Sequence, residues 1–220
     1  MPPVEDPAGF IRSQTALGSP TMVPEFRLWL ASEITPIWEA TETVLEQIGI
    51  DPPYWAFCWP GGQAIARFLL DHPYQVRGRT VFDFAAGGGV ASLAARAAGA
   101  HRVMANEIDS MAIAAIELNS RTNGLSIETD TADWLERPAE PEFDIVMAGD
   151  VCYERDMSRR ALVWLRSHAA RGRLVLLGDP GRNYFSADGL VELARYEIPT
   201  SLQLENRGMR ETTVWRVMPA

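Results

Sequence analysis

The sequence predicts an α/β protein in which a mainly parallel sheet carries helices on both faces, and three observations support this fold class. From residue 80 onward, apolar runs of strand length alternate with helical patterns, as in parallel strands joined by crossover helices. A glycine or an Asn-Gly pair follows the first two of these helices and marks where each one ends. Two further strand patterns close the chain, and their spacing allows an antiparallel pair at the sheet edge.

Residues 1–50 are expected to form a helical extension that packs on a single domain formed by residues 51–220. The prolines and glycines among the first residues leave room for one short helix, Ala8–Leu17. A second helix is expected after Pro36, with Thr35 as its N-cap and a glycine as its stop.

An aromatic segment follows this extension, because residues 53–62 read Pro-Tyr-Trp-Ala-Phe-Cys-Trp-Pro-Gly-Gly. Pro60 and the two glycines mark a sharp turn into a helix whose apolar face includes Ile65 and Phe68. Leaving so many aromatic side chains in water is costly. The segment therefore either covers the edge of the core or lines a cleft.

The remaining elements are predicted from apolar periodicity and from turn residues. Strands are expected at Thr80–Phe84, His101–Asn106, Ser126–Thr129, Phe143–Ala148 and Arg173–Leu177, and helices at Val90–Ala98, Ser110–Thr122 and Arg155–Ala169. The tail is expected to hold a short helix at Ala187–Ala194 and strands at Tyr196–Leu204 and Thr212–Met218.

Composition narrows the function classes. The chain is 47% hydrophobic and 22% charged, as in ordinary globular proteins, and its formal net charge is −9. An acidic surface argues against broad binding to nucleic acid or to acidic membranes and favours a basic or neutral partner. All 20 basic residues are arginine; a G·C-rich coding sequence explains the missing lysine more simply than protection from self-modification does.

The chain shows no secretory signal and no membrane span, so we expect a cytoplasmic protein. Cys58 and Cys152 are interpreted as two buried free thiols. His72, His101 and His168 have no ligand spacing and are expected at the surface or at strand ends, and no metal is expected. With no long heptad pattern, a monomer is expected.

A glycine-rich turn follows the first strand of the alternating region and opens a helix, in the form Asp83-Phe-Ala-Ala-Gly-Gly-Gly89. Such a turn lets the backbone approach a ligand at a helix start, although many strand-to-helix turns need glycine without binding anything. Glu107, at the end of the second strand, lies at about the distance where an acidic residue binds ribose hydroxyls. Its alternative role, as a helix cap, is better filled by Asp109 and Ser110.

This D-x-A-x-G-x-G pattern, with Ser92 where dinucleotide-binding turns have a third glycine, resembles the first motif of class I (seven-strand) S-adenosylmethionine-dependent methyltransferases. The resemblance implies a Rossmann-like, doubly wound, seven-stranded sheet and the cofactor S-adenosyl-L-methionine. It implies that Asp83, Ala85, Gly87, Gly89, Glu107 and Gly149 belong to the cofactor site. It also implies that Asp133-Trp134 presents an acid to the adenine amino group and an apolar side chain to the ring.

Residues Gly149-Asp150-Val151-Cys152-Tyr153 have the Asp-x-x-Tyr form of the lysine-directed branch known as methyltransferase family sixteen. Together with residues 53–64, 105–109 and 178–182, they resemble the lysine methyltransferases that act on the beta subunit of electron-transfer flavoprotein. The resemblance runs from about Pro24 to Val217. Its mild departures are Glu107, where aspartate is common, and Ala85, where glycine or serine occurs.

For the reaction that this resemblance implies, Asp150 and Tyr153 are the candidate catalytic residues. Asp150 is expected to dock the substrate lysine through a charge-assisted hydrogen bond, and Tyr153 to shape the channel. Trp59 is expected to cover the methionine end of the cofactor or the lysine channel. The alternatives are a helix cap for Asp150 and core packing for the two aromatic residues, while Arg182 either contacts the protein substrate or only forms a turn.

Three functions stay open on the sequence alone. The first is lysine methylation of electron-transfer flavoprotein beta subunit. The second is methylation of another acceptor, such as a ribosomal protein lysine or a small nitrogen-containing molecule. The third is a noncatalytic binding module that keeps the fold, although its intact motif residues argue against it.

Overall fold

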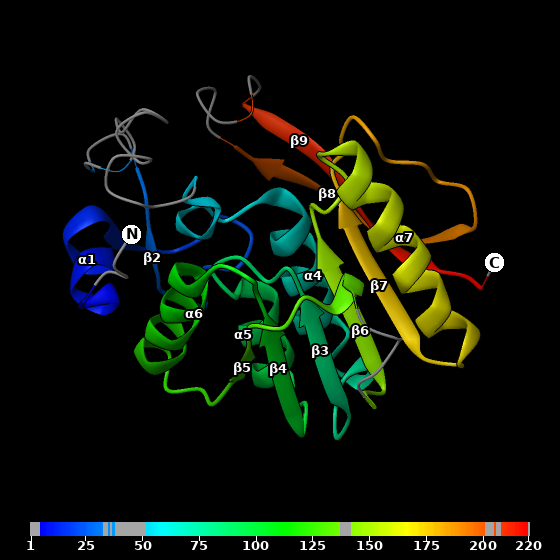
Figure 1. The fold of residues 1–220 in the computed structure, drawn as a ribbon, viewed down its shortest axis with the longest axis horizontal. Coiled ribbons are helices and arrows are strands. Elements are labelled where there is room, and N and C mark those ends of the chain that lie inside the picture. The colour runs from blue at the N-terminus through cyan, green and yellow to red at the C-terminus, as the bar shows by residue number, and fades with distance from the viewer. Residues whose placement is uncertain are drawn as a thin grey trace.

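The computed structural model describes residues 5–32, 35, 37, 52–136, 142–200, 205 and 208–219. Within them, a seven-stranded sheet with the strand order β5-β4-β3-β6-β7-β9-β8 runs through the molecule (Figure 1). A separate two-stranded ribbon, β1-β2, lies toward the N-terminus. This confirms the predicted mainly parallel, doubly wound sheet. None of the described helices is long and apolar enough to cross a membrane.

The elements follow one another along the chain with short connections. The helices are α1 (Pro7–Gln14), η1 (Tyr54–Ala56), α4 (Pro60–Asp71), η2 (Pro73–Gln75), α5 (Val90–Ala97), α6 (Ser110–Thr122), η3 (Trp134–Glu136) and α7 (Arg155–Ala170). The strands are β1 (Ala16–Gly18), β2 (Leu28–Leu30), β3 (Thr80–Phe84), β4 (Arg102–Asn106), β5 (Glu128–Asp130), β6 (Ile145–Gly149), β7 (Leu174–Asp179), β8 (Leu190–Pro199) and β9 (Met209–Val217).

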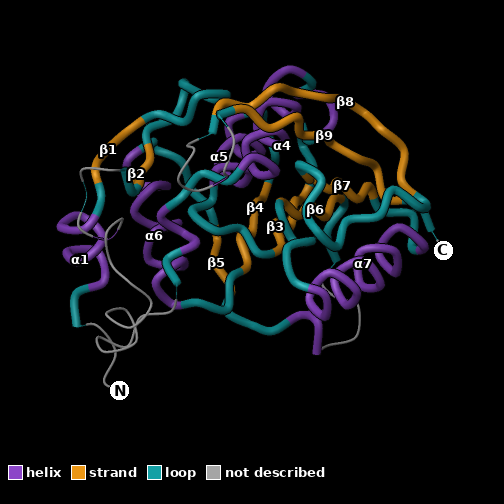
Figure 2. The backbone as a smooth tube through the Cα atoms, turned by 90° about the horizontal axis from the view of Figure 1, so that it is seen from above, coloured by secondary structure: helices purple, strands orange, loops and turns teal. Residues whose placement is uncertain are grey.

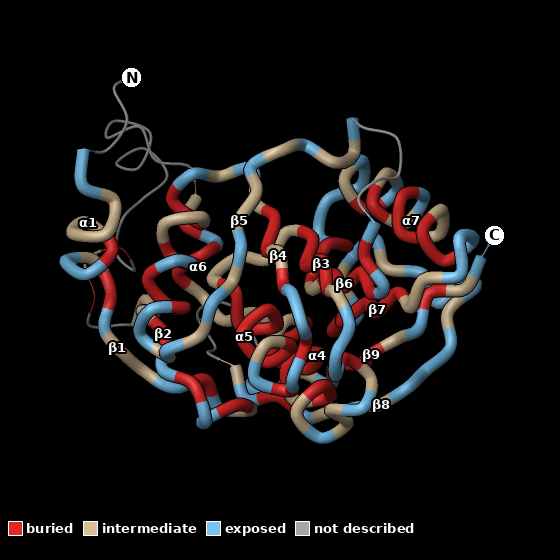
Figure 3. Tube along the Cα trace, turned by 90° about the horizontal axis from the view of Figure 1, so that it is seen from below, coloured by how far each residue is buried: buried red, intermediate tan, exposed pale blue. Residues whose placement is uncertain are grey.

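Helices cover both faces of the sheet, with α4 and α5 on one side and α6 and α7 on the other (Figure 2). The reason is the alternation of side chains along buried strands: Val81 and Met147 point into the cluster under α4 and α5, whereas Phe82 and Val146 point into the cluster under α7. Buried backbone accordingly fills the space between the helix layers (Figure 3).

Strand β3 pairs in parallel with both β4 and β6, so the strand order reverses at this point. In open α/β sheets, the crevice beyond the carboxyl ends of such strands is where ligands bind. The turns after β3, β4 and β6, which carry the predicted site residues, all lie at this edge of the sheet.

The far edge of the sheet is antiparallel, as predicted, because β9 pairs antiparallel with β7 and with β8. The helix expected at Ala187–Ala194 is wrong: residues from Leu190 onward belong to β8, which pairs with β9 from Leu190 to Pro199. The partner strand stabilises an extended conformation that local periodicity did not indicate, since strand formation depends on cross-strand neighbours.

The N-terminal part is less helical than expected within the described residues. Helix α1 begins at an Asp6 side chain that accepts a hydrogen bond from Gly9 N at 2.9 Å, and it ends at Gln14. Residues 16–18 then pair antiparallel with residues 28–30, a ribbon that the sequence did not predict. Ile11 packs in the same cluster as Trp55. Most of the helix expected after Pro36 lies outside the described residues.

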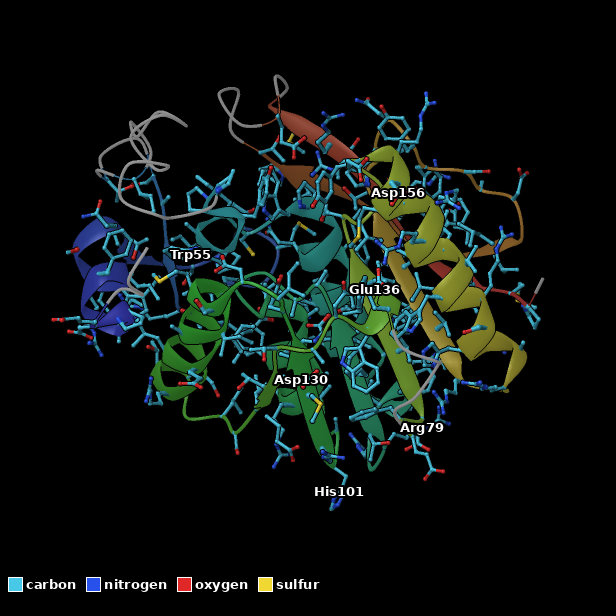
Figure 4. The ribbon with its side chains drawn as sticks, in the orientation of Figure 1. Trp55, Arg79, His101, Asp130, Glu136 and Asp156 are labelled. Atoms are coloured by element: carbon cyan, nitrogen blue, oxygen red, sulfur yellow. The ribbon has the colours of Figure 1, made fainter. Side chains whose placement is uncertain are left out.

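The expectation for His168 is also wrong, because this side chain is buried on α7 rather than exposed. Its ring centroid lies 4.2 Å from that of Trp164, and Arg173 contacts its Nδ1. Burial, followed by the nearby arginine, lowers its pKa to about 4, so the imidazole is neutral. His101, in contrast, is exposed and lies with Arg79 at the opposite end of the sheet from Trp55 (Figure 4).

Three glycines let the start of α4 press directly against the ends of β6 and β7. A Cβ atom on Gly61 would lie 2.3 Å from Gly178 O, and one on Gly178 would lie 2.3 Å from Gly61 O. A Cβ atom on Gly149 would lie 2.7 Å from Gly62 N. Only hydrogen fits at these positions, so the sequence Trp-Pro-Gly-Gly is held close to the sheet.

We expect Gly178→Ala to lower the free energy of unfolding by about 2–3 kcal/mol, because its new methyl group clashes with rigid backbone. Gly18→Ala is the matched control, since a Cβ atom there meets nothing within 4 Å. Chemical denaturation of both variants measures the difference. Equal stability of the two variants would show that the joint between α4 and the sheet yields easily.

Candidate active site

A pocket opens at the carboxyl edge of the sheet, between the ends of β3 and β6 and the start of α4. Its walls enclose about 470 Å³, open solvent included. The predicted site residues in its lining are Trp59, Asp83, Ala85, Gly87, Gly149 and Asp150. Sequence reasoning missed the contribution of β2, which brings Leu28 and Leu30 to the wall, and that of Phe57 and Cys58 from the aromatic segment.

The glycine-rich turn forms the floor of this pocket. Ala85, Gly87 and Gly89 have φ angles of 52°, 56° and 83°, so every second residue is in the left-handed region. Such alternation points successive backbone N–H groups into one concavity. Ala85 adopts this conformation despite its Cβ atom, which costs on the order of 1 kcal/mol and is a mark of functional loops.

Glu107 closes one side of the turn, because its Oε1 accepts a hydrogen bond from Gly87 N at 2.7 Å. A carboxylate offers about four acceptor positions, so Glu107 keeps capacity for the hydroxyl groups of a ribose. Burial raises its pKa to about 7, and Asp109 adds to the shift. Gly89 lies at the N-terminus of α5 and shapes the turn from behind.

Asp83 is a second carboxyl group that is poorly solvated. It is 2% exposed, and its Oδ2 accepts a hydrogen bond from Ser92 Oγ at 2.6 Å. Burial raises its pKa to about 7, and the nearby Glu107 adds to the shift. A cation in the pocket would stabilise the ionised form of both groups. S-Adenosylmethionine carries a sulfonium and an ammonium charge, so this pair of carboxyl groups and the open turn fit the cofactor.

Asp133 and Trp134 lie beyond the end of β5 and are not part of the pocket wall. Asp133 is exposed, and its Oδ1 accepts a hydrogen bond from Leu135 N. The Trp134 indole N–H donates to Asp130 Oδ2 at 2.5 Å (Asp130 is labelled in Figure 4). Asp130 is a residue that sequence reasoning missed: its backbone oxygen accepts from Glu107 N at 3.0 Å and so ties this segment to the pocket.

The structure places Asp150 at the centre of a dense set of contacts. It has a left-handed backbone with a φ angle of 58°, and it is 8% exposed. Its Oδ2 accepts from Gly61 N at 2.5 Å and from Gly62 N at 3.2 Å. Its Oδ1 accepts from Arg182 Nε at 3.1 Å and from Arg182 Nη2 at 2.6 Å. Burial raises its pKa to about 6, against the opposing effect of Arg182.

Asp150 therefore does act as a helix cap, but for the start of α4 and not for the helix that follows it. Glu154 caps that following helix, α7, by accepting from Asp156 N and Met157 N. All of the roughly four acceptor positions of the Asp150 carboxylate are occupied. A substrate amine that hydrogen-bonds to Asp150 must replace one of the Arg182 N–H groups.

Arg182 connects Asp150 to the antiparallel edge of the sheet. Its Nη1 and Nη2 donate to the two carboxylate oxygens of Glu205 at 3.0 and 2.8 Å. Glu205 also accepts from Arg210 Nε at 2.9 Å. The Arg182 guanidinium lies over the Trp59 ring, 5.4 Å from its centroid. The four charges Asp150, Arg182, Glu205 and Arg210 thus alternate in sign.

Tyr153 lies outside the pocket wall, among exposed aromatic side chains. It is 50% exposed, and its ring centroid lies 5.9 Å from that of Tyr54, which is 52% exposed. Tyr54 in turn contacts the Trp59 ring at 6.2 Å, and its backbone oxygen accepts from the Trp59 indole N–H. These three rings connect the predicted catalytic tyrosine to the pocket through Trp59.

Comparisons with known proteins agree with this geometry. A family model described as Ribosomal protein L11 methyltransferase (PrmA) matches residues 65–150. The chain is 36% identical over 209 residues to the electron transfer flavoprotein beta subunit lysine methyltransferase of Mus musculus, covering 91% of this chain and 80% of that protein. It shares 35% identity with the Homo sapiens protein of the same name, covering 96% of this chain and 81% of that protein.

Solved structures share the fold. A ribosomal protein L11 methylase from Lactobacillus delbrueckii subsp. bulgaricus superposes with a TM-score of 0.54 at 21% identity, covering 84% of this chain and 94% of that chain. A 16S rRNA methyltransferase from T. thermophilus, in complex with AdoMet and guanosine, superposes with a TM-score of 0.52 at 19% identity. It covers 74% of this chain and 44% of that chain.

We expect the affinity for S-adenosylmethionine to rise with pH up to about 7 and then to level off. The cationic cofactor favours the ionised carboxylates of Asp83 and Glu107, whose pKa values are raised to about 7, so binding below that pH must displace protons. Titration calorimetry between pH 5.5 and 8.5 measures the effect.

In the same experiment, Glu107→Gln should weaken binding about tenfold or more, as loss of a charge-assisted hydrogen bond does, and should flatten the pH dependence. Glu128→Gln, at an exposed carboxylate paired with Arg102, is the control that should leave binding unchanged. Affinity that does not change between pH 5.5 and 7 would contradict the role of these two carboxyl groups.

Proposed function

The chain belongs to the family of electron transfer flavoprotein beta subunit lysine methyltransferases, and from this membership we propose that it methylates lysine side chains of an electron transfer flavoprotein beta subunit. The chain is an S-adenosylmethionine-dependent protein-lysine methyltransferase. The observation that carries the proposed substrate is the match at 36% identity over 91% of this chain and 80% of the mouse relative.

When bound, the cofactor supplies a methyl group on a positively charged sulfur, which an uncharged amine attacks in line. The chain has to align the lysine nitrogen with that methyl group and exclude competing water. A free lysine titrates near ~10.4, so presenting its neutral form at pH 7 costs on the order of 4 kcal/mol. The surroundings of the acceptor must lower this cost.

Several of this chain's residues are proposed to bind the cofactor. The turn from Asp83 to Gly89 and the Glu107 carboxylate would hold its ribose and methionine parts, because they form one side of the pocket. Gly149 leaves room at the end of β6. For Asp133 and Trp134, which lie outside the wall, we keep the proposal of adenine contacts, supported by their link to Glu107 through Asp130.

The acceptor side is proposed to be formed by Trp59, Asp150 and Tyr153. The exposed rings of Tyr153 and Tyr54 offer an apolar surface to the methylene stem of a lysine, and Trp59 continues that surface into the pocket. Asp150 is proposed to accept one hydrogen bond from the amine, in place of the longer contact from Arg182 Nε.

The partner is proposed to present a lysine on a basic or neutral surface, and the protein is proposed to act as a monomer in the cytoplasm. The net charge of −9 supports such a partner. Near Tyr153, Glu154 and Asp156 are exposed at the start of α7 (Figure 4). Cys58 and Cys152 are free thiols, although Cys58 is only partly buried, and free thiols suit a reducing compartment.

A ribosomal protein lysine is the second candidate acceptor, because the family model for ribosomal protein L11 methyltransferases matches residues 65–150. Relatives of that name match at 42% identity over only 34% of this chain. The shared part covers the cofactor turn and ends at Asp150, so it supports the cofactor more than the acceptor.

With labelled S-adenosylmethionine, we expect the purified protein to label an electron transfer flavoprotein beta subunit and not ribosomal protein L11. Because the chain contains no lysine, its own side chains add no methyl-lysine background. Scintillation counting and mass spectrometry of both acceptors measure the transfer. Labelling of the ribosomal protein alone would overturn the proposed substrate.

Tyr153→Ala should raise KM for the protein substrate about tenfold, because it removes an apolar wall of the proposed channel, while cofactor affinity stays unchanged. Tyr184→Ala is the control: this tyrosine is also exposed, and its ring lies by Arg155 instead of the pocket. Steady-state kinetics with the labelled subunit compare the two. Equal KM values would place the channel elsewhere.

A further inference from the structure

Asp150 faces the acceptor end of the pocket with its charge already balanced. The side chains of Asp150 and Arg182 are 10% and 15% exposed, and that of Glu205 is 3% exposed, so water screens this ion chain poorly. Arg182 donates through two nitrogens to Oδ1 of Asp150, and Glu205 holds the same guanidinium from the other side. Arg210 in turn pairs with Glu205, which prevents Glu205 from drawing Arg182 away from Asp150.

This balance matters for the acceptor because a bare carboxylate stabilises an ammonium ion. An opposite charge within about 4–6 Å shifts a pKa by roughly 1–3 units toward the charged form. A lone Asp150 carboxylate would therefore bind a lysine well but hold it in the protonated form that cannot attack. Pairing with an arginine removes that effect while keeping the carboxylate oxygen as an acceptor.

The other ionisable groups around Asp150 do not supply the positive charge. Those that face it are Cys58 before α4, Cys152 and Tyr153 after β6, Asp179 at the end of β7, and Glu205 before β9. The three of these that are not carboxyl groups have raised pKa values and are neutral at pH 7, mainly because of burial. Of the described residues that contact Asp150, Arg182 is the cation.

We propose that Arg182 is a positioning residue that neutralises Asp150, so that the acceptor end of the pocket takes up the uncharged amine of a lysine in preference to its ammonium form. This inference rests on the proposed lysine-methylating function. The amine replaces the Arg182 Nε contact at 3.1 Å, while the Nη2 contact at 2.6 Å remains. Glu205 and the Trp59 ring keep the guanidinium in place during that exchange.

The main test is Arg182→Gln, assayed as kcat against pH at saturating substrate, because kcat reports the groups of the enzyme–substrate complex. We expect the rising limb of kcat to move about 1–3 pH units toward alkaline values and KM at pH 7 to fall. A merely structural arginine would change neither the position of the pH profile nor lower KM.

Arg67→Gln is the matched control, because Arg67 also lies between two carboxylates, Glu25 and Asp71, but on the far part of α4. Its pH profile should coincide with that of the unchanged protein. The double variant Asp150→Asn with Arg182→Gln removes both charges together. Its profile should return to the wild-type position on the pH axis, even where its maximal rate is lower.

A second measurement needs no turnover: calorimetric binding of Nα-acetyl-lysine amide in the presence of S-adenosylhomocysteine. The unchanged protein should bind the ligand more tightly as pH rises from 7 toward 10, since the neutral fraction of the amine grows. Arg182→Gln should bind it about tenfold more tightly at pH 7 and lose that advantage at pH 10. If the variant does not fold, the pH dependence of the unchanged protein still decides.

The outcomes separate this inference from the proposed substrate. If the unchanged protein binds the lysine amide with the expected pH dependence but does not label the flavoprotein subunit, the substrate is wrong and the inference stands. If it labels the subunit and the kcat profile of Arg182→Gln coincides with its own, only the inference is overturned. Tighter wild-type binding at pH 7 than at pH 10, or no lysine binding at all, also overturns it.

Discussion

The carboxylate of Asp150 joins three parts of the chain that are far apart in the sequence, and the geometry of the pocket depends on it. It binds the first N–H groups of α4, ends β6 in a left-handed turn, and holds the arginine that follows β7. Without a side chain of this length and charge, α4 would lose its cap and Arg182 one of its two carboxylate partners. The close approach of Gly61 to Gly178 leaves no room for another solution.

Burial of carboxyl groups connects the stability of the protein to its ligand. Asp83, Glu107 and Asp150 surround the pocket, and burial raises all three pKa values, to about 7, 7 and 6. A raised carboxyl pKa means that the folded state binds more protons than the unfolded state between about pH 4 and 7, so each group reduces stability as pH rises through that range. The pocket is thus the place where the empty protein is least satisfied, and a cationic ligand corrects this.

The sequence predicts those features that follow directly from local pattern. The strand Thr80–Phe84 and the helix Ser110–Thr122 agree with the structure residue for residue, because each has a strong period and clear ends. The edge strand β8 and the ribbon β1-β2 were missed, since their extended form comes from a partner strand. Likewise, the turn after β3 could be recognised, whereas the partners of Asp150 lie 89 and 32 residues away and only the fold brings them together.

The outer strand β8 also has a consequence for how the protein behaves at high concentration. An exposed sheet edge is a template for pairing with other chains, which leads to aggregation. Here the edge carries the ion pairs of Arg195 with Glu192 and Glu211, a register shift near Glu192, and Pro199 at its end. These features deter strand addition from outside, so the surface left open to a protein partner is the one at the carboxyl ends of the strands.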